Sequence, residues 1–367
     1  MPPNTAACLT ASKSKPLEVK SAPYTSPREN EIVIKNGAVA INPIDWLIQE
    51  TGSIGFPWIT YPFTPGSDVA GEVVEVGRAV TRFKVGDCVV GHALGLSKGH
   101  SSAEGAFQTY TVLLAHMASP IPNTLSYESA AVLPLGLSTA ACGLFQTDQL
   151  ALQYPSTSPK PTGKTLLVWG GATSVGSNAI QLAVAAGYEV ITTASPRNFD
   201  YVKKLGASQV FDYNSKTVVD DLIHAFEGKT IAGALSIGHG AADACLDILR
   251  DCKGNKFISM ATYPVPSPPP KHFVLLLTVL SFASWSIICW FKSRARQIRT
   301  KFIHGSTLVD NGVGKVIYED FLPKALAEGT YLAAPDPIVV GKGLEYIQAG
   351  FDLQKKGVSA KKVVVSL

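Results

Sequence analysis

The segment from Thr165 to Gly187 constrains the fold of this chain more than any other part of the sequence. An apolar run leads into a turn at Gly170 and Gly171, and a helical pattern then runs to Gly187. A strand, a glycine turn and a helix N-terminus together form an anion site, because free N–H groups and the helix dipole face the same point. A second strand-like run, residues 188–195, follows at the spacing of a βαβ unit. The pattern therefore favours nucleotide binding over an ordinary strand–helix loop.

The end of the second strand indicates which nucleotide would bind. Sites specific for NAD usually place an Asp or Glu there, to bind the ribose 2′-hydroxyl. This chain instead carries Ser195, Arg197 and Asn198. These side chains suit a solvated loop, but they can also hold a 2′-phosphate through charge-assisted hydrogen bonds. We therefore expect the cofactor to be NADPH rather than NADH.

The length and composition of the chain limit the classes of protein to which it can belong. A chain of 367 residues is expected to form two domains. The net charge is only +4, with basic residues scattered, so a nucleic-acid partner is not expected. Six cysteines without a CxxC pair indicate reduced thiols. The N-terminus has no basic region followed by an apolar run, so we expect no signal peptide and a cytoplasmic protein.

The pattern along the chain predicts an α/β protein with three consecutive parts. Residues 1–140 contain short β-type runs separated by Gly and Pro, which predicts a compact β-rich domain. Residues 141–314 alternate strands with helices, which predicts a doubly wound parallel sheet. Residues 315–367 return to a mixed pattern that ends in a strand.

Besides the glycine turn, five segments carry recognisable motifs: 40–46, 65–71, 83–89, 105–110 and 354–362. In this order they make the chain resemble the medium-chain dehydrogenase/reductase superfamily over nearly its whole length. It resembles especially the zinc-free quinone oxidoreductases and the fungal trans-acting enoyl reductases. The resemblance implies a GroES-like β-rich catalytic domain, made by 1–140 and 315–367, and a Rossmann domain.

The resemblance also implies that the chain holds no metal. Zinc alcohol dehydrogenases of this superfamily bind catalytic zinc through Cys, His and a further Cys or acid. The matching positions here are Asn42, Ser67 and Leu135, and an amide, a hydroxyl and an alkyl group cannot replace those ligands. The four-cysteine structural zinc lobe is missing as well, since no cysteine lies between Cys88 and Cys142.

Without a metal, alcohol oxidation loses its usual route to an alkoxide. Hydride transfer from NADPH to an activated C=C bond or a quinone can proceed without a Lewis acid, because the acceptor's carbonyl delocalises the developing negative charge. We therefore expect a zinc-independent reductase of small enones, enoyl thioesters or quinones, with a place in fungal secondary metabolism as the resemblance implies. The alternatives are a tailoring dehydrogenase acting on a C–O bond and a non-catalytic NADPH-binding protein. The chain is expected to be a monomer or homodimer.

Cofactor contacts are expected at three places. At the pyrophosphate we expect Gly171, Thr173, Ser174, Val175 and Gly176. At the 2′-phosphate we expect Ser195, Arg197, Asn198 and, by resemblance to the fungal enoyl reductases, Tyr213. Ligands bind at the carboxyl ends of parallel strands, so near the nicotinamide we expect Ser236, Ile237, Gly238, Ala261 and Thr262.

Residues of the first part are expected to line the substrate cleft: Asn42, Asp45, Trp46 and Ser67. Asp45 and Asp68 can equally be buried carboxylates that hold loops. Tyr61 and His92 are possible proton donors, although a structural role is the better interpretation of each.

An apolar insert near 272–298 departs from the superfamily pattern. From Phe273 to Phe291 it contains no charged residue, and four basic residues follow between 292 and 299. This meets the description of a membrane-anchoring helix. An oligomerisation helix and a translated intron are the other two interpretations. Membrane association through this segment is therefore the alternative to a purely cytoplasmic protein.

Overall fold

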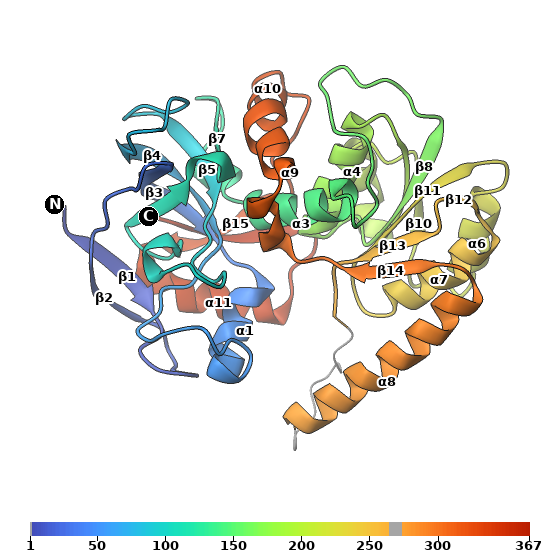
Figure 1. Cartoon of the computed structure of the whole chain (residues 1–367), viewed down its shortest axis with the longest axis horizontal. Coiled ribbons are helices and arrows are strands. Elements are labelled where there is room, and N and C mark those ends of the chain that lie inside the picture. The colour runs from blue at the N-terminus through green and yellow to red at the C-terminus, as the bar shows by residue number, and fades with distance from the viewer. Residues whose placement is uncertain (1, 264–273) are drawn as a thin grey trace. The chain divides into compact units, whose positions relative to one another are not determined.

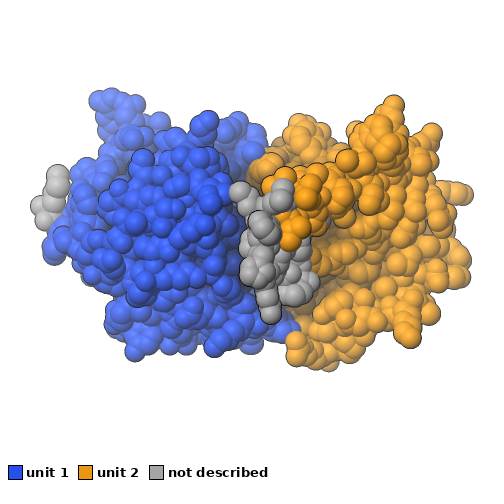
Figure 2. Space-filling view, turned by 90° about the horizontal axis from the view of Figure 1, so that it is seen from below, with its two compact units in different colours: residues 1–138, 306–367 blue, residues 139–305 orange. Residues whose placement is uncertain are grey.

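The computed structural model describes residues 2–263 and 274–367 (Figure 1). The chain divides into two compact units, shown in different colours in Figure 2. Unit 1 comprises Met1–Ser138 and Ser306–Leu367, and unit 2 comprises Thr139–Gly305. The chain passes from the first to the second within the helix α3 (Pro134–Phe145).

Unit 2 contains a parallel sheet with the strand order β10-β9-β8-β11-β13-β14, and the short β12 (Lys253–Gly254) pairs with β11. This confirms the predicted Rossmann-type, doubly wound sheet. The order reverses between β8 and β11, and ligands of such sheets bind outside the carboxyl ends of the strands at that point. The main strands are β8 (Lys164–Trp169), β9 (Glu189–Ala194), β10 (Gln209–Asp212), β11 (Thr230–Ser236), β13 (Phe257–Met260) and β14 (Arg299–Phe302).

The strands of unit 2 are apolar because helices cover the sheet. Leu167, Ile191, Ala234 and Ile258 are completely buried in one cluster. The helices are α4 (Ser174–Ala185), α5 (Phe199–Lys204), α6 (Val218–Ala225), α7 (Ala241–Asp251) and α8 (Val274–Ala295). The helical part of the predicted insert is α8, whereas the stretch 264–273 lies outside the described residues.

Unit 1 contains a second sheet, in the order β15-β16-β3-β4-β5-β7, with β6 pairing with β3. The strands are β3 (Glu31–Ala40), β4 (Asp68–Val76), β5 (Cys88–His92), β6 (Tyr110–Leu114), β7 (Ala118–Pro120), β15 (Asp336–Lys342) and β16 (Lys361–Ser366). The pair β1 (Asn4–Cys8) and β2 (Glu18–Ala22) forms a separate small sheet. This unit is the predicted GroES-like domain.

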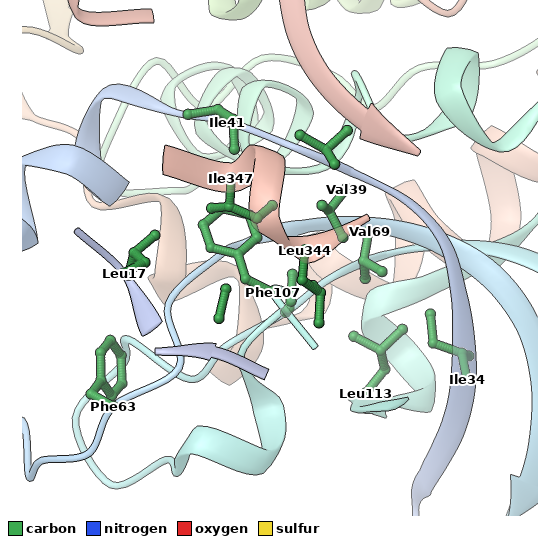
Figure 3. Packing of buried hydrophobic residues seen from close by; sticks show 14 of the residues in the cluster. Leu17, Ile34, Val39, Ile41, Phe63, Val69, Phe107, Leu113, Leu344 and Ile347 are labelled. Atoms are coloured by element: carbon green, nitrogen blue, oxygen red, sulfur yellow. The ribbon is translucent and has the colours of Figure 1, made fainter. Parts of the chain in front are cut away.

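The C-terminal segment belongs to unit 1 because it completes the core of that unit. The last strand, β16, pairs antiparallel with β3, so that Val364 lies opposite Ala40. Figure 3 shows Leu344 and Ile347 from the C-terminal segment beside Phe107 and Val69 from the N-terminal one. The helices of this unit are α1 (Pro43–Thr51), α2 (Tyr127–Ala130), α9 (Gly312–Lys315), the π-helical turn η6 (Val316–Phe321), α10 (Leu322–Ala327) and α11 (Ile347–Lys356).

One helical stretch among the described residues, Tyr127–Phe145, is long and apolar enough to cross a membrane, with a mean hydropathy of 1.3. Of the residues in its apolar 18-residue window, 78% are buried inside the protein, as in the core helix of a globular fold. Length and apolarity are therefore weak evidence for a span here.

Candidate functional site

The glycine turn that follows β8 is tied to the neighbouring strand β9. Gly170 has a φ of +89°, a conformation that glycine adopts without strain. Its N–H donates to Thr193 Oγ1 at 3.0 Å, and the N–H of Gly171 donates to Thr193 O at 2.9 Å. These bonds fix the turn at the carboxyl end of the sheet.

Thr173 caps the helix α4. Its Oγ1 accepts a bond from the N–H of Gly176 at 3.0 Å and donates to Gly170 O at 2.8 Å. The N–H groups of Gly171 and Gly176 are thus already hydrogen-bonded, and the two glycines contribute through their lack of a side chain. A Cβ on Gly176 would lie 2.2 Å from Gly170 O, and one on Gly171 would lie 2.2 Å from Thr192 Oγ1.

Three N–H groups of the turn are left without a partner in the part of the chain that the structure describes: those of Ala172, Ser174 and Val175. The hydroxyl of Ser174 is buried and likewise has no partner there. Buried polar groups are normally hydrogen-bonded. Open donors at the N-terminus of a twelve-residue helix are what a pyrophosphate requires, so the residues fit a dinucleotide.

The residues predicted for the 2′-phosphate lie at the ends of two adjacent strands. Ser195 follows β9, and its Oγ accepts a bond from Asn198 Nδ2 at 3.1 Å. Arg197 is exposed and forms no ion pair with any described residue. Tyr213 follows β10, which pairs with β9, and is 46% exposed. The structure therefore places these residues after the carboxyl ends of two neighbouring strands.

The residues predicted near the nicotinamide lie at the carboxyl ends of β11 and β13. Gly238 N donates to Thr262 Oγ1 at 2.8 Å, and Ala261 N donates to Ser236 O at 2.9 Å. A cavity of about 210 Å³ opens beside Gly238 and Thr262. Its other lining residues, which the sequence did not indicate, are His239, Gly240, Ala242, Asp243, Tyr263, Ser281 and Trp285.

In unit 1, Asn42 is the N-cap residue of α1, and the proline that follows it suits the first position of a helix. The Oδ2 of Asp45 accepts a bond from the backbone N–H of Asn42 at 2.7 Å. The side-chain Nδ2 of Asn42 donates to Asp68 Oδ2 at 2.8 Å. The other oxygen of Asp68 accepts the N–H of Leu135 at 2.6 Å. Three of these positions, 42, 68 and 135, are therefore brought together around one carboxylate.

Lys362 completes this cluster, and the sequence analysis did not identify it. Its Nζ lies 2.8 Å from Asp68 Oδ2 and also donates to Asn42 Oδ1. The side chains of Lys362 and Asp68 are only 5% and 0% exposed. The sequence feature that could have indicated it is a lysine directly before the apolar residues of the C-terminal strand β16. We refer to Asn42, Asp68 and Lys362 as the buried triad.

Two further titratable groups near the buried triad have shifted pKa values. Burial raises the pKa of Asp45 to about 8, and the Oδ1 of this carboxyl has no hydrogen-bond partner among the described residues. Burial lowers the pKa of His92 to about 4, so this imidazole is neutral at pH 7. Its Nδ1 contacts Ser138 Oγ at 2.9 Å, which in turn contacts Tyr318 Oη at 2.8 Å.

The other predicted side chains lie in different surroundings. The indole N–H of Trp46 donates to Gln354 on α11. Ser67 is buried and precedes Asp68, and its carbonyl accepts the N–H of Ala93. The hydroxyl of Tyr61 is buried without a partner in the described structure.

The donor set in unit 1 does not suit zinc. Among the residues that the structure describes, no group of three or more His, Cys, Asp or Glu gathers as metal ligands would. Leu135 offers a backbone N–H, which is a donor and not a ligand. The Asp68 Oδ2 and Asn42 Oδ1 atoms already bind an ammonium group.

The chain matches two known domain families. The family described as alcohol dehydrogenase GroES-like domain matches residues 28–123. The family described as zinc-binding dehydrogenase matches residues 174–262. The second match begins at the first residue of α4 and includes β9, β10, β11 and β13.

Curated relatives match over the full length. A dehydrogenase of Monascus ruber, pigH, is 58% identical over 369 residues, covering 100% of both chains. A trans-enoyl reductase of Aspergillus japonicus, himH, is 40% identical over 367 residues, covering 99% of this chain and 97% of its own. Among solved structures, the Escherichia coli quinone oxidoreductase complexed with NADPH has the same fold, with a TM-score of 0.69, 19% identity and complete coverage of both chains.

Proposed function

Since the chain belongs to the medium-chain dehydrogenase/reductase superfamily and is an oxidoreductase with a nicotinamide cofactor, we propose that it is a metal-independent, NADPH-dependent reductase. Its acceptor is a small molecule with an activated C=C bond, an enone or enoyl thioester, or a quinone.

The buried triad is the observation that carries this proposal. Asn42 stands at a position where the resemblance to zinc alcohol dehydrogenases implies a metal ligand, and the triad already contains a cation, the ammonium of Lys362. A divalent cation placed between Asn42 and Asp68 would lie within a few ångströms of that ammonium, and the two like charges would repel strongly in a buried site. The triad therefore supports a mechanism without a Lewis acid.

The triad also fixes the orientation of the Asn42 amide. An ammonium group only donates hydrogen bonds and a carboxylate only accepts them, so Oδ1 must face Lys362 and Nδ2 must face Asp68. One N–H of this amide then has no partner among the described residues. We infer that it donates to the carbonyl oxygen of the acceptor, where negative charge develops during reduction.

The cofactor supplies the hydride when it is bound. The free N–H groups of Ala172, Ser174 and Val175 and the hydroxyl of Ser174 would bind its pyrophosphate. Ser195, Arg197, Asn198 and Tyr213 would bind the 2′-phosphate, which supports NADPH over NADH.

The names of the relatives favour different acceptors. A trans-enoyl reductase at 40% identity supports reduction of a C=C bond. A protein named only dehydrogenase at 58% identity keeps a C–O bond as the second candidate.

The test is a steady-state assay of purified protein with NADPH and NADH against enones, enoyl thioesters and quinones, with and without EDTA. We expect turnover that EDTA does not reduce, and roughly tenfold or greater preference for NADPH. A requirement for added zinc would refute the metal-independent proposal. Faster oxidation of alcohols with NADP⁺ would favour the C–O candidate, and tight NADPH binding without turnover of any acceptor would favour a non-catalytic protein.

A further inference from the structure

The helix α8 is apolar around most of its circumference, and much of that apolar surface is exposed. It lies at the outer side of unit 2, beside α7 and β14 (Figure 1). A surface helix normally buries its apolar side and exposes its polar one. Here the side that faces the protein combines apolar packing with polar contacts, since Phe282 and Trp285 lie against Phe302 and Cys289 is buried in the core cluster of unit 2. The side chains that face away are nevertheless mostly large and apolar.

The inner side of α8 is attached to α7 through two carboxylates. Asp243 accepts the indole N–H of Trp285 at 3.0 Å and the ammonium of Lys292 at 2.8 Å. Asp247 lies 2.6 Å from the guanidinium of Arg296. These contacts recur at the spacing of helical turns, so they define one face of the helix.

The outer side of α8 concentrates apolar surface that nothing in the described structure covers. Ile287, Trp290 and Phe291 are 58%, 56% and 62% exposed. Single exposed apolar residues are ordinary, but a contiguous apolar stripe marks an interaction surface. The stripe also includes Leu277, Val279, Leu280 and Ile288.

Charge indicates what covers this stripe. The segment 274–299 contains no acidic residue, and α7 neutralises two of its four basic residues. The others, Arg294 and Arg299, are exposed and have no ion pair with described residues. Arg294 follows Trp290 and Phe291 by one helical turn, so a cation lies next to exposed aromatic rings. An apolar face with aromatic and basic residues at its margin fits the interface of an anionic membrane.

We propose that α8 attaches this protein to an anionic lipid surface, with the helix lying in the plane of the interface. A crossing orientation is disfavoured, because Asp243 and Asp247 would enter the hydrocarbon with the helix to which they are bonded. The length of α8, 22 residues, would suit either orientation, so these ion pairs decide between them.

Flotation of the full-length protein with phosphatidylcholine vesicles, with and without about 30% phosphatidylserine, tests the proposal. We expect binding to the anionic vesicles and at least about tenfold weaker partitioning for the double variant Ile287→Ser, Phe291→Ser. Arg294→Gln should weaken binding to the anionic vesicles several-fold at low salt. At high salt the variant and the wild-type protein should bind alike, because salt screens the attraction between the guanidinium and the lipid headgroups. All variants should keep their thermal unfolding temperature and NADPH affinity, since the altered side chains point away from the fold.

Matched controls lie in unit 1. Val85 is 61% exposed and Lys98 is also exposed, so Val85→Ser and Lys98→Gln remove similar groups elsewhere and should leave flotation unchanged. Failure of the wild-type protein to float with anionic vesicles would overturn the proposal. So would a concentration-dependent dimer that the α8 double variant abolishes, which would identify a second copy as the occupant.

Discussion

The glycine turn of unit 2 and the buried triad of unit 1 differ in how fully their polar groups are hydrogen-bonded within the protein. In the turn, the hydroxyl of Ser174 and neighbouring N–H groups have no partner in the described structure. In the triad, Lys362 and Asp68 neutralise each other, and Asn42 bonds to both of them. The turn has several open donors, whereas the triad is a mostly internal network in which one N–H of the oriented Asn42 amide has no partner among the described residues.

The largest expected effect comes from breaking the triad. Lys362→Met leaves the charge of Asp68 buried and unpaired, so we expect a loss of about 3–5 kcal/mol in unfolding free energy, measured by urea denaturation. The adjacent Lys361 forms an exposed pair with Asp336, and Lys361→Met should cost well under 1 kcal/mol. The double variant Lys362→Met, Asp68→Asn should recover part of the loss. Equal losses of unfolding free energy in Lys362→Met and Lys361→Met would show that the triad stabilises the fold no more than an exposed ion pair does.

The second effect concerns pH. The folded-state pKa of Asp45, about 8, is above its unfolded value, so its contribution to stability is fully present only below the unfolded pKa. That contribution falls as pH rises toward 8, by at most about 1.4 kcal/mol per pH unit. Asp45→Asn should remove this part of the slope between pH 5 and 8, measured by urea unfolding.

Asp87 is the matched control for Asp45, because it also accepts the backbone N–H of the residue three positions before it. Asp87→Asn should keep the wild-type slope. If Asp45→Asn keeps it too, the carboxyl of Asp45 is ionised in the folded protein, and the network around the triad carries one more buried negative charge than we infer.

The third effect tests the turn. Gly176→Ala places a Cβ 2.2 Å from Gly170 O, so the turn must shift and its open N–H groups move. We expect about tenfold weaker NADPH binding by calorimetry, with about 1–3 kcal/mol of destabilisation. Gly312 begins α9 with nothing within 4 Å of such a Cβ, and Gly312→Ala should change neither quantity appreciably. Unchanged affinity in Gly176→Ala would mean that the pyrophosphate does not bind at this turn.

The smallest effect concerns selectivity. Arg197→Ala should weaken NADPH binding about five- to tenfold and leave NADH binding unchanged, because in the proposed site this guanidinium binds the 2′-phosphate, which NADH lacks. Lys98→Ala, a charge deletion in unit 1, should affect neither cofactor. An equal loss for both cofactors would place Arg197 away from the 2′-phosphate.

Local sequence signals predicted the turn well and the triad poorly. The apolar run, the glycines and the helix cap at Thr173 are all close in sequence, and the structure places them as one strand–turn–helix unit. Asn42 and Lys362 are 320 positions apart, and no local pattern could pair them. His239, Tyr263 and Trp285 were missed for the same reason, since they meet only around the cavity beside Gly238.

The sequence by itself determined the fold class, because apolar periodicity and glycine placement depend on neighbours within a few residues and are read directly. It also indicated the superfamily and the absence of thiolate and imidazole ligands at Asn42 and Ser67. Only the tertiary structure decided which cation lies beside Asn42, and which side of α8 faces outward. Apolar residues lie all around that helix, so the sequence pattern alone does not show which side faces the protein. The contacts of Asp243 and Asp247 on α7 with Trp285, Lys292 and Arg296, together with the packing of Cys289, hold one face against unit 2 and turn the opposite face outward.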